Sequence, residues 1–259
     1  MAEKDSPKPH DEIVQDQIRM GFRDYERSNL GLSLSAFTAG LEIGFSVMLM
    51  GILHAMFSGK VDDHILSLIV AAGYPLGFIF VIIGRSELFT EQTALAILPV
   101  LNGRASVREL LGLWGFVIAG NLIGGLLFAI FITWIGPQSG RIPVASFQHM
   151  AHVMVDPDWQ VTLGSAVLAG WMMGLLGWLI SSVRESISHV VIVVLITLII
   201  GAGGLHHCIV GNIEVLSGWL VGDGITFRDY IEFLVFTVIG NTIGGAFFVS
   251  VLKYRQMRA

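Results

Sequence analysis

Residues 84–93 read GRSELFTEQT and form a polar interruption inside an apolar run over 64–98. A second interruption, GGLHHC at 203–208, lies inside the apolar run over 187–220. Both runs exceed the roughly 20 residues that span a bilayer, so we interpret each as a broken membrane helix. Non-helical backbone at membrane depth is tolerated only where protein buries it or a watery cavity meets it. Both breaks are therefore expected to line a path or a site.

The rest of the chain is also that of a membrane protein. Of its 259 residues, 54% are hydrophobic and 14% are charged, whereas a soluble domain has roughly a quarter charged residues. The net charge of −5 provides no positive potential that would attract phosphates, so no nucleic-acid partner is expected. The expected partner is the lipid bilayer. We predict an all-α membrane protein with six spans. The apolar stretches are 31–57, 64–98, 107–135, 160–182, 187–220 and 229–252.

An internal repeat organises these six spans. Residues 106–128 align without gaps on 226–248, an offset of 120, and share the pattern Gly-Asn-Xaa-Ile-Gly-Gly. The same offset aligns the first polar interruption with the second, so that Glu87 corresponds to His207. Each half then has three helices, and because three is odd the halves must insert with opposite polarity. The prediction is an inverted repeat of two three-helix halves whose second and fifth helices are broken.

Lys and Arg residues in the flanks of the spans predict the orientation. Nine of them fall on the side of the two termini and three on the opposite side, which favours cytoplasmic termini. We expect a multi-pass protein of the cell (inner) membrane in three parts. These are a cytoplasmic tail with a surface helix at 1–28, the transmembrane domain at 29–253 and a cytoplasmic tail at 254–259. Ile13, Val14 and Ile18 recur at helical spacing within the first part.

The two breaks resemble those of the formate/nitrite transporter family. The matching residues are Ser86-Glu87-Leu88-Phe89-Thr90 and Gly204-Leu205-Xaa-His207-Xaa-Ile209, within a resemblance that covers roughly residues 20–255. The family implies an aquaporin-like protomer fold, a homopentamer and one substrate path through each protomer. It also implies small monovalent anions such as formate, nitrite or hydrosulfide as substrates. No enzyme activity and no cofactor are expected.

The resemblance also assigns site residues. Thr90 would face a central histidine, His207, between apolar constrictions. The expected pathway residues are Tyr74, Phe78, Glu87, Leu88, Phe89, Thr90, Glu91, Ile200, His206, His207 and Asn212.

At four positions the sequence departs from the usual family pattern. His206 replaces a glutamate, Asn212 comes one residue late, Glu91 replaces a small residue, and Gly170 stands where many members have a path-facing asparagine. An extra carboxylate such as Glu91 repels anions, so these changes resemble a less characterised branch of the family.

Several further roles follow from residue chemistry. Asn121 and Asn241, at equivalent positions of the repeat, are expected to bond to free backbone groups of the breaks. Glu87 is expected to accept from N–H groups at the start of the helix after the first break, and Arg85 to pair with Glu87 or Glu91. The other charges in or near the spans, Glu42, Glu214 and Glu232, are expected to pair or to reach an interface.

A metal site is disfavoured. His206, His207, Cys208 and Glu214 offer suitable donor atoms, but consecutive histidines diverge and a structural zinc site needs four converging ligands.

These observations favour a channel or transporter for small anions. The N-termini of the two half-helices would attract the anion, while Thr90 and His207 would donate hydrogen bonds or a proton to it. A neutral-solute or water channel of the same architecture remains the alternative, since the acidic residues of the break could discourage anions. An intramembrane protease is disfavoured because no Gly-Xaa-Ser-Gly nucleophile motif occurs.

Overall fold

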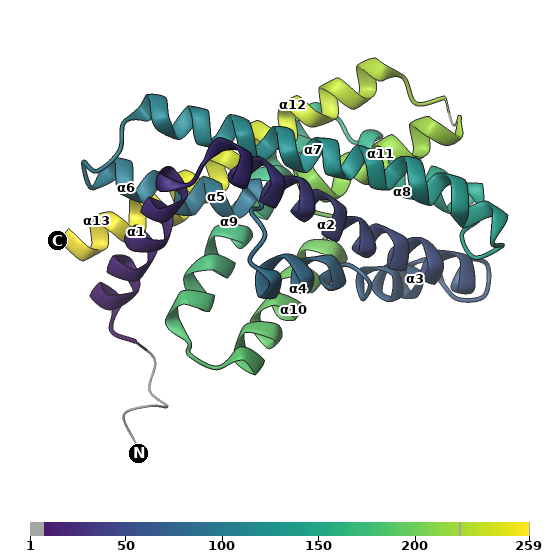
Figure 1. Ribbon diagram of the computed structural model, residues 1–259. Coiled ribbons are helices and arrows are strands. Elements are labelled where there is room, and N and C mark those ends of the chain that lie inside the picture. The colour runs from purple at the N-terminus through teal and green to yellow at the C-terminus, as the bar shows by residue number, and fades with distance from the viewer. Residues whose placement is uncertain (1–7, 223, 259) are drawn as a thin grey trace.

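The computed structural model describes residues 8–222 and 224–258, and within these ranges every regular element is helical. Three spans are continuous: α2 (Asn29–Phe57), α7 (Val107–Gln138) and α9 (Trp159–Ser182). The sixth runs through α12 (Phe227–Ile243), a π-helical segment η2 (Gly244–Val251) and α13 (Leu252–Arg258). Figure 1 shows these long helices side by side, with both termini at one end of the molecule. We call that end the inner half and the opposite end the outer half.

The remaining two spans are broken. The second consists of α3 (Asp63–Ala71) and α4 (Pro75–Gly84), then a break, then α5 (Phe89–Leu95) and α6 (Ile97–Leu101). The fifth consists of α10 (Ser186–Ala202), a break and α11 (Cys208–Val221). Neither α10 nor α11 alone is long enough to cross a bilayer. The predicted all-α fold of six spans with the second and fifth broken is confirmed.

The two halves repeat the same close helix contact. A Cβ atom on Gly40 of α2 would lie 2.3 Å from the carbonyl oxygen of Asn121 in α7. A Cβ atom on Gly170 of α9 would lie 2.2 Å from the carbonyl oxygen of Asn241 in α12. Only glycine allows the backbones to approach this closely. The contact also corrects one expectation, because position 170 faces α12 rather than the path.

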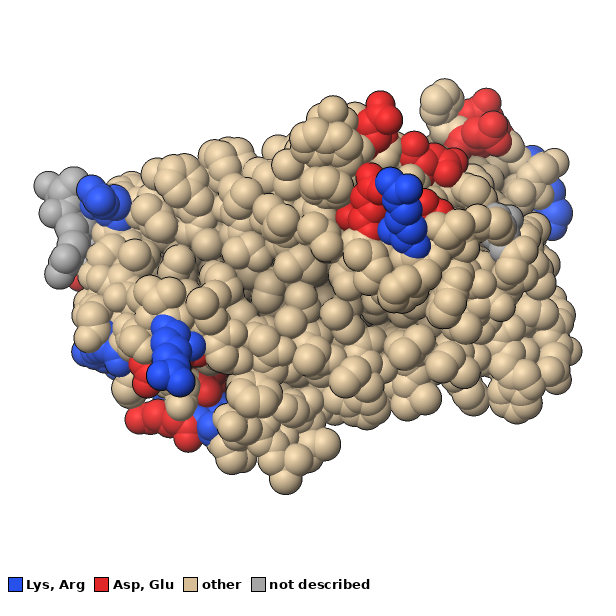
Figure 2. All heavy atoms as spheres, turned by 90° about the horizontal axis from the view of Figure 1, so that it is seen from above, with Lys and Arg blue, Asp and Glu red and all other residues tan. Residues whose placement is uncertain are grey.

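The outer surface of the bundle is suited to lipid. Figure 2 shows charged side chains gathered in a few patches, with a broad uncharged surface between them. Large apolar side chains are exposed on several spans, among them Leu111, Phe131, Trp134, Leu195 and Phe247. Contiguous apolar surface on this scale is typical of a membrane interface.

Two helices outside the spans close the ends. In the inner half, α1 (His10–Glu26) is the helix that the sequence predicted, and it buries Ile13, Val14 and Ile18 against a cluster that includes Trp178. In the outer half, α8 (Val144–Val155) follows the third span and packs against α11. The sequence analysis did not predict α8, because its apolar residues continue no long run.

Candidate functional site

Both breaks turn through one left-handed residue and restart from one extended residue. In the first break, Arg85 has φ 59° and Leu88 has φ −104° before α5 begins. In the second, Gly204 has φ 58° and His207 has φ −105° before α11 begins. The equivalent residues are thus 119 positions apart (204 − 85 and 207 − 88). The offset of 120 that holds for the later spans does not hold within the breaks.

Asn121 of α7 holds the first break. Its Nδ2 donates to the carbonyl oxygens of Ala36 at 2.7 Å and Glu87 at 2.9 Å. Its Oδ1 accepts the N–H of Phe89 at 2.8 Å. One amide therefore ties the break and the first N–H of α5 to α2 and α7.

Asn241 of α12 makes the equivalent contacts at the second break. Its Nδ2 donates to the carbonyl oxygens of Ala166 at 2.8 Å and His206 at 3.0 Å, and its Oδ1 accepts the N–H of Cys208 at 2.9 Å. These are the backbone bonds expected from the sequence. They also correct the register, because Glu87 corresponds to His206 and not to His207.

His207 and Thr90 meet where the two breaks come together. The imidazole Nε2 lies 2.8 Å from Thr90 Oγ1, and both side chains are buried. The other ring nitrogen, Nδ1, accepts the N–H groups of Ile209 and Val210, each at 3.3 Å. Since backbone N–H groups can only donate, Nδ1 carries no proton and Nε2 carries it. Nε2–H then donates to Thr90, whose own hydroxyl hydrogen remains free to donate.

The start of α11 does not offer the free N–H groups that the sequence analysis expected. Cys208 N–H is taken by Asn241, those of Ile209 and Val210 by His207, and that of Gly211 by the His207 carbonyl at 2.9 Å. An anion at this point would therefore rely on the side chains of Thr90 and His207, with the helix dipole as background.

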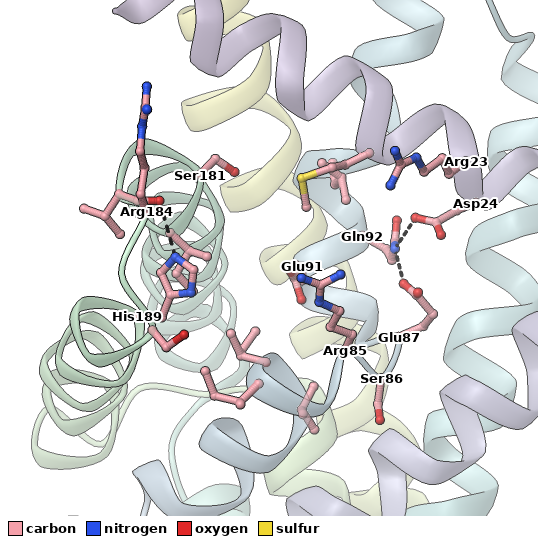
Figure 3. A pocket seen from close by; sticks show the side chains of 18 of the residues that line it. Arg23, Asp24, Arg85, Ser86, Glu87, Glu91, Gln92, Ser181, Arg184 and His189 are labelled. Carbon is pink, nitrogen blue, oxygen red and sulfur yellow. Dashed lines mark hydrogen bonds between the residues drawn. The ribbon is translucent and has the colours of Figure 1, made fainter. Parts of the chain in front are cut away.

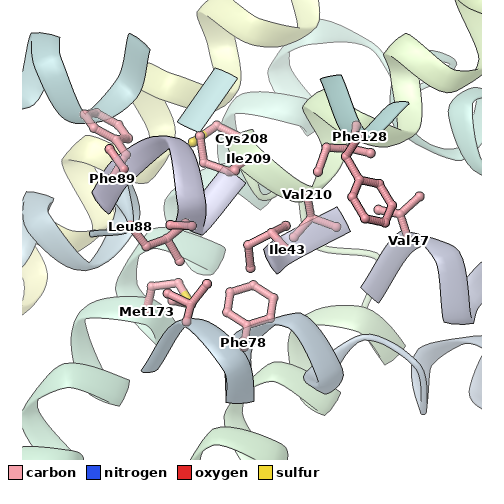
Figure 4. Packing of buried hydrophobic residues seen from close by; sticks show 14 of the residues in the cluster. Ile43, Val47, Phe78, Leu88, Phe89, Phe128, Met173, Cys208, Ile209 and Val210 are labelled. Carbon is pink, nitrogen blue, oxygen red and sulfur yellow. The ribbon is translucent and has the colours of Figure 1, made fainter. Parts of the chain in front are cut away.

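An apolar layer closes around this pair. The Phe78 ring meets the His207 ring edge-on at 5.2 Å, and Tyr74 stacks on Phe78 at 5.4 Å. Leu88 and Ile200 are fully buried. Figure 4 shows Phe78 and Leu88 directed toward the same region, together with Ile43 and Met173. Of the four residues expected at the constrictions, Phe78 contacts the histidine and Tyr74 contacts Phe78, while Leu88 and Ile200 belong to the same buried apolar cluster.

Three other expected pathway residues contact different parts of the protein. Phe89 packs edge-on against Trp114 of α7. His206 Nδ1 lies 2.8 Å from Ser165 Oγ in α9. Asn212 Oδ1 accepts the hydroxyl of Tyr230 at 2.8 Å.

None of these three side chains contacts Thr90 or His207 in the described part of the chain. Adjacent helical residues lie about 100° apart around the axis, so neighbours of a pathway residue face other elements. Phe89, His206 and Asn212 therefore pack against the helices that surround the site.

A cavity of about 720 Å³ opens beside the first break in the inner half. Its wall includes residues of α1, α4, α5 and α10 and the break itself. Glu87 and Glu91 both line it, as does Leu95. Figure 3 shows Arg85 and Glu91 facing the same space. The cavity lies between the N-terminal helix and the first break, on the inner side of the contact between Thr90 and His207.

Glu87 belongs to a network of four side chains at the edge of this cavity. It pairs with Arg27, which directly follows α1, while Gln92 Nε2 bridges Glu87 and Asp24 (Figure 3). This corrects two expectations. Glu87 does not cap α5, and its ion-pair partner is Arg27 rather than Arg85. The sequence could not show this, because Arg27 lies 60 residues away.

Asp24 and Glu214 are two further candidates that the sequence analysis did not assign to the path. Burial of Asp24 raises the pKa of its carboxyl above the usual range. Glu214 of α11 is only 3% exposed and has no ion pair among the described residues. Glu214 was expected to pair or to reach an interface, and in the described part of the chain it does neither. Searched over the described residues, no group of three or more His, Cys, Asp or Glu side chains is placed to hold a metal ion.

Comparisons with known proteins give the family. The formate/nitrite transporter family matches residues 11–255. The Inner membrane protein YfdC of Escherichia coli is 30% identical over 253 residues, covering 96% of this chain and 78% of that protein.

Two solved structures share the fold. An FNT family ion channel superposes with a TM-score of 0.83 at 21% identity, covering 94% of this chain and 98% of the other. A pentameric formate channel with formate bound superposes with a TM-score of 0.76 at 20% identity, covering 89% and 98%. These matches do not favour the water-channel alternative. With six spans, two matched breaks and a family match over nearly its whole length, the chain belongs to the formate/nitrite transporter family.

Proposed function

We propose that this protein carries small monovalent anions of the formate, nitrite or hydrosulfide class through each protomer. The observation that carries the proposal is the buried contact between His207 and Thr90, held between two breaks and enclosed by Phe78 and Leu88. A family whose name is formate/nitrite transporter and a structural neighbour with formate bound support it.

The geometry defines what the histidine contributes. A substrate that enters the apolar layer, as the anion or as the neutral acid, loses its water, and its oxygens need replacement donors. The Thr90 hydroxyl supplies one, and the His207 Nε2–H supplies a second when it leaves Thr90. A second proton on His207 Nδ1 would face the N–H groups of Ile209 and Val210, so it would require the cap of α11 to open. His207 thus acts as a hydrogen-bond donor rather than as the source of a transferred proton.

Flux measurements test this assignment. In proteoliposomes, Thr90→Val should lower formate uptake about tenfold, because one hydrogen bond to a charged group contributes roughly 1.5 kcal/mol or more. His207→Asn can still cap α11 through its amide oxygen but cannot keep the contact to Thr90, so uptake should fall at least as far.

His206→Asn is the matched control for these two variants. It changes the neighbouring imidazole, which contacts Ser165 and not Thr90, so uptake should stay close to that of the wild type. If His206→Asn abolishes uptake and His207→Asn does not, the site is assigned to the wrong histidine. Water and glycerol permeability measured on the same vesicles checks the neutral-channel alternative.

We also propose that the protein lies in the inner membrane with both termini in the cytoplasm. The bias of nine against three Lys and Arg residues supports this orientation, and the similarity to the inner membrane protein YfdC supports the location. Single-cysteine labelling of intact cells tests it, with Cys208 buried and unreactive. An impermeant reagent should modify Asp62→Cys in the outer half and not Gln256→Cys, and the reverse pattern would overturn the orientation.

A homopentamer is the proposed assembly. The similarity to a pentameric channel and the exposed apolar faces of several spans support it. Native mass spectrometry with lipid retained should give about 141 kDa, five times the protomer mass of 28.2 kDa. A mass of one protomer under those conditions would contradict the proposal.

A further inference from the structure

Glu214 is a buried carboxylate that the arrangement around His207 and Thr90 does not use. It lies on α11, two helical turns beyond His207 in the outer half, and only 3% of its surface is exposed. Neither a hydrogen bond nor an ion pair holds it within the described residues. An ionisable side chain left unpaired at membrane depth is costly, and such residues are usually part of substrate or proton pathways.

The packing of α11 shows which way Glu214 faces. One side of the helix contacts α8 and α12, since a Cβ on Gly211 would meet Phe233 and a Cβ on Gly218 would meet Ala151. A second side contacts α7, where Asn212 and Ile213 lie against Gly125.

Glu214 follows His207 by seven residues, or two helical turns, and lies at the edge of the side where Gly211 and Gly218 contact α12 and α8. Glu214 thus shares its face of the helix with the central histidine.

The repeat gives a second, independent indication. Within the breaks and the helices that follow them the offset is 119, so Glu214 of α11 is equivalent to Leu95 of α5 (214 − 119 = 95). Leu95 lines the inner cavity. The pseudo-two-fold relation therefore places Glu214 at the corresponding position of the outer half of the path.

Tyr74 is the polar neighbour of Glu214 on that path. The carboxylate lies within electrostatic range of the Tyr74 hydroxyl. The ring of Tyr74 stacks on Phe78, and Phe78 contacts His207. The Ser46 hydroxyl fixes this position, donating to the Tyr74 carbonyl at 2.6 Å and accepting the Gly77 N–H at 2.8 Å. Tyr74 thus interacts electrostatically with Glu214, while its ring is joined to the central pair through Phe78.

Ser217 is the next polar residue on the same face of α11, three positions beyond Glu214. It is fully buried, and among the described residues its hydroxyl has no hydrogen-bond partner. Two unpartnered polar side chains therefore follow one another along the outer half of this face.

We propose that Glu214 is the proton-exchange group of the outer half and that it selects anions of weak acids. The inference rests on the proposed anion transport. The Glu214 O–H bond breaks as an O–H bond forms on an incoming formate, which leaves a carboxylate and neutral formic acid. The neutral acid crosses the apolar layer past Phe78 and Leu88 and releases its proton into the water of the inner cavity. Glu214 then regains a proton from the outer water, so that one anion and one proton move together.

The titratable groups on the elements around Glu214 do not neutralise it. The elements packed against α11 are α2, α7, α8 and α12. Their titratable groups are Glu42, His54, Arg108, Glu109, His149, His152, Arg228, Asp229, Tyr230 and Glu232, with Tyr74 ahead of α4 and His207 and Cys208 at the start of α11. None of them forms an ion pair with Glu214 in the part of the chain that the structure describes. His54 is engaged with Ser146 and stacked on His149.

Transport measurements on Glu214→Gln test the proposal. In proteoliposomes with a pH gradient, the variant should lose about 100-fold of gradient-driven formate accumulation, the lower end of what a positioned proton donor contributes. Formate-dependent proton uptake, followed with an entrapped pH dye, should disappear with it. Glu232→Gln, which changes an exposed glutamate of α12, is the matched control and should behave as the wild type. Unchanged accumulation and proton uptake in Glu214→Gln would overturn the proposal.

Infrared difference spectra separate this proposal from the proposed function. The wild-type protein at neutral pH should show the C=O band of a protonated carboxyl, which Glu214→Gln removes and Glu232→Gln keeps. Tyr74→Phe should shift that band while leaving the ring stack on Phe78, and it serves if Glu214→Gln does not fold. A missing band, or a band unaffected by both variants, refutes the role of Glu214. A wild-type protein that has the band but carries no anion would refute the proposed function instead.

Discussion

The first and second breaks share a backbone and differ in their side chains. Each turns through a left-handed residue and is bound by one asparagine from the following span. The first carries Glu87, which is tied to Arg27 directly after the N-terminal helix. The second carries His206, which is tied to Ser165 inside the bundle. The two breaks thus share a backbone arrangement related by the pseudo-twofold axis but carry chemically different side chains.

This difference shows how an inverted repeat produces a directional path. Backbone hydrogen bonds must be satisfied at membrane depth in both halves, so the asparagines and the close-packed glycines are retained at equivalent positions. Side chains that face the path carry no such requirement. At one equivalent pair of positions the inner half has Leu95 and the outer half has Glu214. The asymmetry of the path therefore lies in single side chains rather than in the fold.

The glycine contacts give the largest expected effect. Gly170→Ala places a Cβ within 2.2 Å of the Asn241 carbonyl oxygen, and Gly40→Ala places one within 2.3 Å of that of Asn121. Because the obstacle is backbone in both cases, each variant should lose about 3 kcal/mol or more of stability. Thermal unfolding in detergent, followed by tryptophan fluorescence, measures the loss.

A matched control is available on the same helix as Gly170. Gly164→Ala meets no atom within 4 Å and should be neutral or slightly stabilising. If only one of the two close-contact variants is destabilised, the helices of the two halves do not pack in the same way.

The asparagines give the next largest effect. Asn121→Ala leaves the Phe89 N–H without its partner, and Asn241→Ala does the same to Cys208. Each should cost about 2 kcal/mol, the usual penalty for a buried unpaired backbone group, and the two losses should be similar. Thr133→Val is the control, since that hydroxyl bonds only within its own helix. A loss at one asparagine alone would mean that the two breaks are supported differently.

The smallest effect concerns pH and the inner cavity. The pKa of Asp24 is raised by burial, so the folded state favours its protonated form, and the stability that this gives is lost as the pH rises. Asp24→Asn removes that loss and should raise stability by about 1 kcal/mol at pH 8, with no gain at pH 4.

Asp16 on the same helix provides the opposite case. A hydrogen bond from Lys8 lowers the pKa of Asp16, so its contribution is present at neutral pH and disappears on acidification. Asp16→Asn should therefore lower stability slightly at pH 8. Thermal melts of both variants at the two pH values check the signs, and a gain for Asp16→Asn would show that the assumed charge states are wrong.

Much of this protein follows from local sequence. Apolar runs of spanning length predicted the six helices, because an exposed apolar stretch of that length is stable only in lipid. Polar interruptions predicted the breaks, and the repeated Gly-Asn pattern predicted the inverted halves and the asparagine contacts. The positions of Thr90 and His207 came from a resemblance in motif.

Other features depend on residues far apart in the chain. The pairing of Glu87 with Arg27 joins a break to a residue 60 positions earlier, and no spacing rule links them. The tautomer of His207 depends on which backbone N–H groups reach Nδ1. The one-residue difference between the offsets 119 and 120 was invisible in the alignment, because it arises between the half-helices and the spans that follow them, outside the aligned residues 106–128 and 226–248.

By itself, then, the sequence determined that this chain crosses a membrane six times in two opposed halves, since hydrophobicity and glycine content act locally along each helix. Only the tertiary structure decided which polar side chains face one another. The fold brings His207 within 2.8 Å of Thr90 from the other break, whereas His206 and Asn212 contact other helices. At membrane depth the neighbours of a side chain, and not its type, decide whether it is structural or free to act on a passing ion.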